Sequence, residues 1–344
     1  MRLACCIGCL AAVSAPALAD GAFLAPNPER TDIREPEQKA VIYWHDGTED
    51  LILNASYEGA PADFAWVVPV PAKPQVEEFD GAIFHELARL TAPPPMLEGR
   101  QDKAKSMAAA PTAPAVEVVE RKEVGPYDVA VLTATGAGAL SQWLERNGYR
   151  FPAEHAAVLE HYTRGTWHFV AMRVAPGKAG RVAGLASGAV ASIRLTFACP
   201  DAPLYPLRIS AINEGATEVL LYLLGERCYG PANPDGLPGS QFREECRGHF
   251  RCGRRELALA KLLGARADCV VTKLRAHVGS REMIADLSLR PVADAPKLHQ
   301  FRYTDHRGRT RTNGERSGRA VIATLGGIVI LLLWALGRRR RVQG

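Results

Sequence analysis

The residues best suited to metal chemistry form a short cluster in the last third of the chain. Cys246, His249 and Cys252 are spaced three apart, and thiolates and imidazoles at such short spacings bind zinc. A structural zinc site needs four ligands, and Cys228 and Cys269 are available to complete the set. In an oxidising compartment, however, thiols pair with one another before they bind a metal. We therefore expect a disulfide framework here, with a zinc site centred on the first three residues as the weaker alternative.

Five cysteines follow the predicted signal segment described below, and all are disulfide candidates: Cys199, Cys228, Cys246, Cys252 and Cys269. Because five is an odd number, at least one thiol stays free or pairs with another chain. The last four lie close together in the sequence, which predicts a stapled C-terminal subregion. The connectivity stays open, and a reactive odd thiol is a further alternative.

A second group of residues offers acid–base chemistry. His45, Asp46 and Asp50 lie around a predicted turn, and His155 and Glu160 lie on a predicted helix. An extracytoplasmic enzyme, for example a hydrolase, would bring two or three of these side chains together in a deep pocket. The simpler interpretation is structural, because Asp46 begins a two-residue hairpin turn and His155 falls on the apolar face of its helix.

Recognisable catalytic motifs are missing from the sequence. It contains no Gly-x-Ser-x-Gly elbow, phosphate loop or dinucleotide fingerprint. His155 and His161 are six residues apart, whereas a helical zinc-protease motif needs its histidines at i and i+4. We therefore predict no catalytic residue and no cofactor.

The N-terminus has the features of a secretory signal, which we assign to residues 1–19. Arg2 supplies a positive start, an apolar stretch follows, and Ala17-Leu18-Ala19 forms a small-residue cleavage site. Because the signal directs the chain out of the cytoplasm, we expect the folded part to lie outside it.

The C-terminus carries a second apolar run, which predicts a transmembrane helix over residues 320–337 and a basic cytoplasmic tail over residues 338–344. A chain already being translocated stops with its C-terminus inside. The expected location is the bacterial inner (cell) membrane, with a single span and the ectodomain in the periplasm or outside. Alternatively, the run is a sorting tail that an intramembrane protease removes.

The formal net charge of +5 comes from the ends of the chain. Arg2 and Arg338–Arg341 account for five of the 42 basic residues, which leaves 37 against 37 acidic residues. Residues 296–319 are strongly basic and predict a juxtamembrane stalk, which either contacts anionic lipid headgroups or is a solvated tether. The remaining body is mildly acidic, which argues against nucleic acid as a partner. The expected partners are the membrane and an envelope protein.

Residues 20–96 predict a β-rich N-terminal part of the ectodomain. The expected elements are strands over 40–44, 51–57 and 63–71 and a helix over 82–90. Residues 97–123 lack periodicity and are rich in alanine, proline and charged residues, so we expect a flexible linker.

Residues 124–295 predict the main part of the ectodomain, including the cysteine-containing subregion. The expected elements are strands over 127–134, 167–174, 192–198, 207–212, 218–224 and 269–277, helices near Leu140 and after Pro152, and a helix over 255–263. This order is typical of an α+β fold with a mostly antiparallel sheet and a few helices.

Four segments carry a resemblance to a known family. They are Asp63–Pro71 (DFAWVVPVP), Gly125–Val129 (GPYDV), Trp143–Tyr149 and Tyr205–Ile209. In these segments the chain resembles bacterial exported proteins of domain of unknown function 2330. The resemblance implies the same signal-plus-tail layout but no activity and no catalytic residues. The chain departs from the family near Asp20, where relatives often begin with a cysteine.

Two classes of function follow from these observations. The first is a non-enzymatic envelope module that binds or supports another component, and it predicts an apolar groove or patch. The second is an enzyme without a linear motif. A thiol- or metal-dependent module centred on Cys246, His249 and Cys252 is a smaller third possibility.

Overall fold

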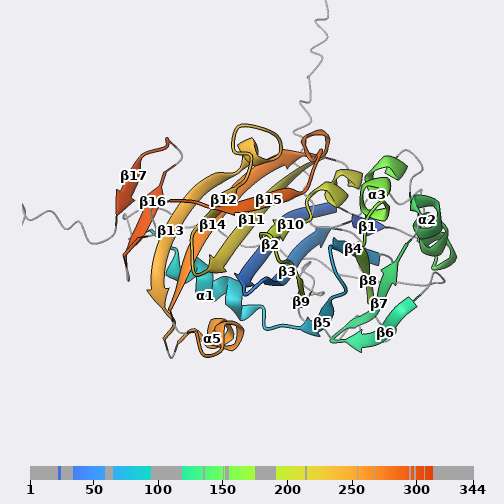
Figure 1. The fold of residues 1–344 in the computed structure, drawn as a ribbon, viewed down its shortest axis with the longest axis horizontal. Helices are drawn as coiled ribbons and strands as arrows, with labels where there is room; N and C mark the ends of the chain where they lie inside the picture. Colours follow the sequence, from blue (N-terminus) through green and yellow to red (C-terminus); the bar gives the residue numbers. More distant parts are fainter. Residues whose placement is uncertain are drawn as a thin grey trace, which may run out of the picture.

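The computed structural model describes residues 22–24, 34–58, 65–93, 118–134, 136–149, 151, 155–174, 191–213, 215–253, 255–266, 268–293, 296–297, 300–305 and 307–312. Two β-sheets pack face to face, and helices cover the outer face of each (Figure 1). The expected α+β architecture is confirmed. The predicted signal (1–19), transmembrane helix (320–337) and tail (338–344) lie outside the described residues. Within the described part, no helix has both the length and the apolar character needed to cross a membrane.

The larger sheet has nine strands in the order β17-β16-β13-β14-β11-β2-β3-β9-β5. Their bounds are β2 Arg34–His45, β3 Thr48–Glu58, β5 Gln75–Glu78, β9 Ile193–Ala198, β11 Ala216–Gly225, β13 Arg243–Arg251, β14 Asp268–Gly279, β16 Phe301–Thr304 and β17 Thr310–Thr312. Among the described pairs, β2 and β11 are parallel and all others are antiparallel, which confirms the predicted sheet type. Strands from both predicted parts of the ectodomain alternate in this sheet, so the two parts share one core.

The second sheet has five strands in the order β1-β4-β8-β7-β6, and a third has three in the order β10-β15-β12. Their bounds are β1 Ala22–Leu24, β4 Ala65–Val70, β6 Val118–Val124, β7 Tyr127–Thr133, β8 His168–Val174, β10 Leu204–Tyr205, β12 Tyr229–Pro231 and β15 Leu287–Pro291. The core between the sheets joins Ile42 and Leu51 of the larger one to Trp66 and Val170 of the five-stranded one.

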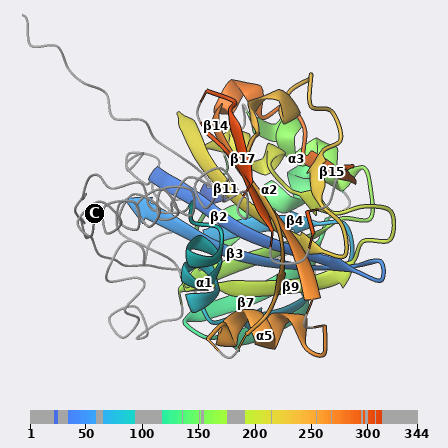
Figure 2. The same ribbon diagram turned by 90° about the vertical axis from the view of Figure 1, so that its left-hand side faces the viewer.

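Two pairs of helices cover the outer faces of the sheets. On the nine-stranded sheet lie α1 (Ala82–Leu90) and α5 (Leu257–Leu263), both visible in Figure 2. The buried Glu86 joins them, because its carboxylate accepts hydrogen bonds from the backbone N–H groups of Ala258 (3.2 Å) and Leu259 (2.9 Å) at the start of α5. On the five-stranded sheet lie α2 (Ala137–Arg146) and α3 (Ala156–Thr163).

Short-range signals predicted several elements correctly. Asp46 and Gly47 have φ values of 49° and 72°, so they form the expected two-residue turn between β2 and β3. The helix predicted over residues 82–90 has the bounds of α1. Gly148, with a φ of 81°, ends the α2 segment as expected.

Two predictions about local structure were wrong. The segment predicted as a strand over residues 207–212 is a 3₁₀ helix, η4 (Arg208–Ile212), and the Arg208 N–H donates to Asp286 at 2.9 Å instead of to a neighbouring strand. The predicted linker over residues 97–123 ends earlier, because residues 118–123 belong to β6 and pair with β7. The contact between Arg208 and Asp286 is long-range and leaves no local pattern, whereas β6 forms a local hairpin with β7 around the turn at Gly125 and Pro126.

The predicted basic stalk over residues 296–319 also needs correction. Within it, β16 and β17 form a hairpin that extends the nine-stranded sheet beyond β13. The ring of Phe301 is almost fully buried against the larger sheet. The folded domain therefore continues to at least Thr312.

A glycine makes this extension possible. Gly248 of β13 pairs with Phe301, and a Cβ atom at Gly248 would lie 2.2 Å from the Phe301 ring. We expect Gly248→Ala to displace the ring, to lower the free energy of unfolding by about 1–3 kcal/mol and to speed amide hydrogen exchange in residues 301–312. Gly138→Ala on α2 is the control, because its new Cβ meets no atom within 4 Å. Equal exchange in both variants would contradict the role of Gly248.

Candidate functional site

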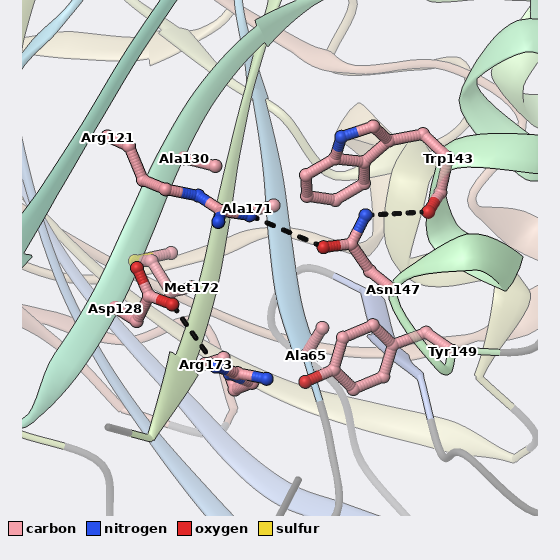
Figure 3. Close-up of a pocket in the computed structure, with 10 residues that line it drawn as sticks. All are labelled: Ala65, Arg121, Asp128, Ala130, Trp143, Asn147, Tyr149, Ala171, Met172 and Arg173. Atoms are coloured by element: carbon pink, nitrogen blue, oxygen red, sulfur yellow. Dashed lines mark hydrogen bonds and ion pairs between the residues drawn. The ribbon is translucent and has the colours of Figure 1, made fainter. Parts of the chain in front are cut away.

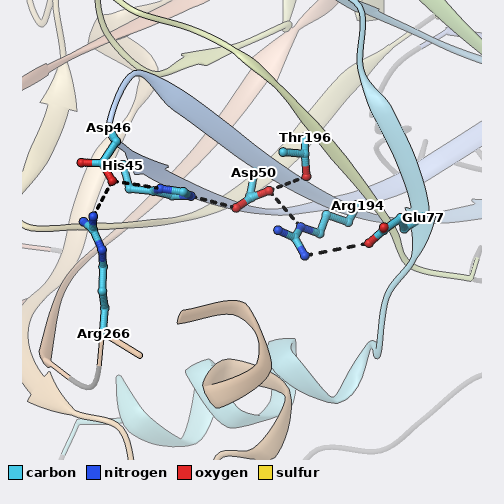
Figure 4. A network of polar contacts seen from close by, with 7 residues as sticks. All are labelled: His45, Asp46, Asp50, Glu77, Arg194, Thr196 and Arg266. Carbon is cyan, nitrogen blue, oxygen red and sulfur yellow. Dashed lines mark hydrogen bonds and ion pairs between the residues drawn. The ribbon is translucent and has the colours of Figure 1, made fainter. Parts of the chain in front are cut away.

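Three of the predicted acid–base residues do come together, at the β2–β3 hairpin (Figure 4). Asp50 is 1% exposed and accepts hydrogen bonds from Arg194 Nε at 2.8 Å and Thr196 Oγ1 at 2.5 Å. Its other oxygen lies 3.2 Å from His45 Nε2, and His45 Nδ1 lies 3.8 Å from Asp46. The network thereby ties β2, β3 and β9 together.

This hairpin network is arranged as a structural clamp. Each carboxylate faces a cationic or potentially cationic group, since Arg194 pairs with Asp50 and Arg266 pairs with Asp46. Among the side chains that form the network, none is a serine or cysteine nucleophile. His155 and Glu160, the other two candidates, lie at the start of and within α3, on the other sheet. The five residues therefore do not form one pocket.

The strand geometry of β13 separates the predicted metal cluster. Cys246 lies in the core under α1 and α5, whereas His249, three positions along the strand, points to the opposite face. Cys252 follows the end of the strand, six positions from Cys246. In the described ranges, no three histidine, cysteine or acidic side chains form a group that could hold a metal ion.

The five cysteines are free thiols in the structure. Burial raises the pKa of Cys228 to about 11 and the pKa of Cys246 and Cys269 to about 12. Such thiols stay protonated at neutral pH, and a protonated thiol is a poor nucleophile and a poor metal ligand. Disulfides among the five stay a prediction, which mass measurement before and after alkylation would test.

A different pocket lies between the five-stranded sheet and the end of α2 (Figure 3). Its floor is a row of alanines on three adjacent strands, Ala65, Ala130 and Ala171. Because alanine side chains are short, the sheet is hollow where the indole of Trp143 lies over it. The enclosed space is about 20 Å³, which accommodates one water-sized group.

Two arginines and one aspartate give the pocket its charge. Asp128 and Arg173 are directly opposite each other on β7 and β8, and Arg173 Nη2 donates to Asp128 Oδ2 at 3.2 Å. Arg121 of β6 is exposed and makes a long contact, 3.5 Å, from Nη2 to Asn147 Oδ1. With two cations and one anion among the lining residues, the pocket carries a net charge of about +1 at neutral pH.

Two buried donors in this pocket have no acceptor. The indole Nε1–H of Trp143, a residue that is 3% exposed, and Nη1 of Arg173, whose side chain is 13% exposed, have no hydrogen-bond partner among the described residues. A buried donor without an acceptor costs about 1–3 kcal/mol. Both groups can donate but cannot accept, so only a hydrogen-bond acceptor satisfies them.

The end of α2 holds these groups in position. Asn147 is 3% exposed, and its Nδ2 donates to the Trp143 carbonyl at 2.8 Å, which closes the last turn of the helix. Gly148 then reverses the chain, so that the Tyr149 N–H donates to the Leu144 carbonyl at 2.8 Å. The Tyr149 ring thereby folds back to form one wall, with its hydroxyl directed towards Arg173 (Figure 3).

Acid–base and metal motifs gave no indication of this pocket. Arg121 fell in the predicted linker, and Arg173 fell in the strand predicted over residues 167–174, to which no site was assigned. The useful signal was the family resemblance, because three of its four segments line the pocket. They contribute Ala65 from the first, Asp128 from the second, and Trp143, Asn147 and Tyr149 from the third.

The fold and the site together define an α+β protein of two packed sheets with a donor-lined pocket. The chain belongs to the family described as uncharacterized protein conserved in bacteria, domain of unknown function 2330, whose model matches residues 15–290. This confirms the resemblance seen in the sequence. No curated protein matches the chain. Among solved structures, baculovirus P35 is similar at 7% identity over 77% of this chain and 98% of that chain, with a TM-score of 0.38, which is too low to support an inference.

Proposed function

We propose that the chain is a non-enzymatic binding protein of the bacterial cell envelope, anchored to the inner membrane by its C-terminal segment, with its folded domain in the periplasm or outside. The location rests on the signal-like start at residues 1–19 and the apolar run at residues 320–337. The binding role rests on one observation, the two buried donors of Trp143 and Arg173 that have no acceptor.

The groups with potential for chemistry support binding over catalysis. The Asp50 network is fully occupied by internal pairs, and the buried thiols are protonated at neutral pH. The pocket, in contrast, has donors left over and little room for a reaction between two substrates. We therefore interpret the pocket as a site that binds a ligand through a hydrogen-bond acceptor.

Crosslinking in intact membranes followed by purification of the full chain tests this proposal. We expect Trp143→Phe to reduce the yield of crosslinked partner at least about tenfold, since it removes one buried donor and keeps the aromatic bulk. Arg164→Gln is the control, because Arg164 is an exposed residue of the neighbouring helix end, with a side chain 77% exposed. A wild-type chain without partner, or one whose crosslinks survive in Trp143→Phe, would contradict the proposal.

A further inference from the structure

We infer that the pocket between α2 and the five-stranded sheet recognises a carboxylate group at the end of a larger ligand. This inference rests on the binding function proposed above and specifies the chemistry of its ligand. Trp143 Nε1 and Arg173 Nη1 can only donate, and the hydroxyl of Tyr149, which also lines the pocket, can donate or accept. The ligand must therefore present acceptors, and a carboxylate presents two oxygens and no donor.

Charge favours an anion over a neutral acceptor. Asp128 neutralises one of the two arginines, which leaves the charge of the other uncompensated within the lining. Hydrogen bonds from charged or polar donors to a carboxylate are roughly twice as strong as those to a neutral carbonyl. A monoanion matches the net charge of about +1.

The dimensions of the pocket limit how far a head group enters. A space of about 20 Å³ accommodates one water-sized group, so one oxygen of the carboxylate enters and the rest of the group lies at the mouth. A phosphate with a double charge exceeds the available countercharge. The row formed by Ala65, Ala130 and Ala171 provides the depth. The exposed Arg121 lies at the mouth, where it would pair with the same anion as it enters.

The indole N–H of Trp143 gives a direct spectroscopic readout. In the full chain in detergent micelles, ¹⁵N-labelled tryptophan gives indole signals for the five tryptophans, and the signal that disappears in Trp143→Phe identifies the residue. We expect sodium acetate, titrated at constant ionic strength against sodium chloride, to shift this signal downfield in a saturable manner. Acetamide, which has the same shape without the charge, is expected to leave it unchanged.

Two further comparisons sharpen the test. Arg173→Gln, which keeps an amide donor beside Asp128, is expected to weaken acetate binding by about tenfold or more, because a charged hydrogen bond is lost. Arg164→Gln changes the charge by the same amount on exposed surface and is expected to leave acetate binding unchanged. N-acetylglycine and its amide then distinguish a peptide-type carboxylate from a small free acid. A site for a peptide-type carboxylate would bind N-acetylglycine more tightly than acetate, whereas a site for a small free acid would not.

The outcomes separate the ligand chemistry from the binding function. No shift with acetate, or equal shifts with acetate and acetamide, overturns the carboxylate assignment. A larger response to sulfate than to acetate overturns it in favour of a tetrahedral anion. If the crosslinked partner is lost in Trp143→Phe while acetate has no effect, the binding function stands and the carboxylate inference falls.

Discussion

In the wild-type protein, the free energy of unfolding is expected to fall as the pH rises from about 4.5 to about 8. Replacing Glu49 with glutamine is expected to abolish this fall. Glu49 is fully buried, and burial raises the pKa of its carboxyl to about 8, although the backbone N–H of Leu204 and the Cys199 thiol oppose the shift. In this window the folded state holds a proton that the unfolded state has released. The proton therefore stabilises the folded state fully below pH 4.5, and the benefit is lost as the pH passes 8.

The size of the effect follows from the shift in pKa. A rise from 4.5 to about 8 corresponds to about 5 kcal/mol between the two limits. Glutamine keeps an oxygen for the Leu204 N–H, which donates to Glu49 Oε2 at 2.9 Å in the wild type. Urea unfolding at pH 5, 7 and 9 should therefore show a falling midpoint in the wild type and a flatter one in Glu49→Gln. The exposed Glu145→Gln is the control, and a wild-type profile as flat as that of Glu49→Gln would contradict the burial of this proton.

The second large loss of folding stability is expected when Asp50 is replaced. Asp50→Asn leaves Arg194, whose side chain is 23% exposed, without its main carboxylate partner. An asparagine oxygen also cannot satisfy Arg194, Thr196 and His45 at once. Removing one partner of a buried ion pair costs about 3–5 kcal/mol, so the urea midpoint should fall strongly.

The hairpin supplies a matched control for this prediction. Asp46→Asn makes the same chemical change four positions away, where the side chain is 69% exposed and where asparagine tolerates the positive φ. Its expected cost is below about 1 kcal/mol, which is usual for a surface ion pair. Similar losses in the two variants would show that Asp50 is not the centre of the clamp.

Local signals in the sequence predicted the elements that depend on short-range geometry. The Asp46-Gly47 turn, the amphipathic helix at 82–90 and the strand-helix unit before Gly148 need little beyond their own residues. The missed strand β13 shows the limit. In REECRGHFR only Cys246 and Phe250 are core residues, and charged neighbours hide the alternation. Its place between β14 and β16 comes from partners far along the chain.

The site could not be predicted from the sequence for the same reason. The pocket combines Arg121, Asp128, Trp143 and Arg173 from three strands and a helix, and no motif spacing relates them. Conversely, residues that are neighbours in the sequence were separated: alternation along β13 directs Cys246 and His249 to opposite faces of the sheet. The sequence spacing of candidate ligands predicts a site well when they lie on a helix or in a turn. It predicts a site poorly when they lie on a strand.

The most direct test of the account is the content of the pocket in the full chain purified from the cells that produce it. A crystal structure of this material is expected to show acceptor atoms of an organic ligand within hydrogen-bond distance of Trp143 Nε1 and of Arg173 Nη1, with the rest of the ligand leaving past Arg121. A lone water molecule at this position, or both donors bonded to groups of the protein itself, would contradict the claim that the pocket is a binding site.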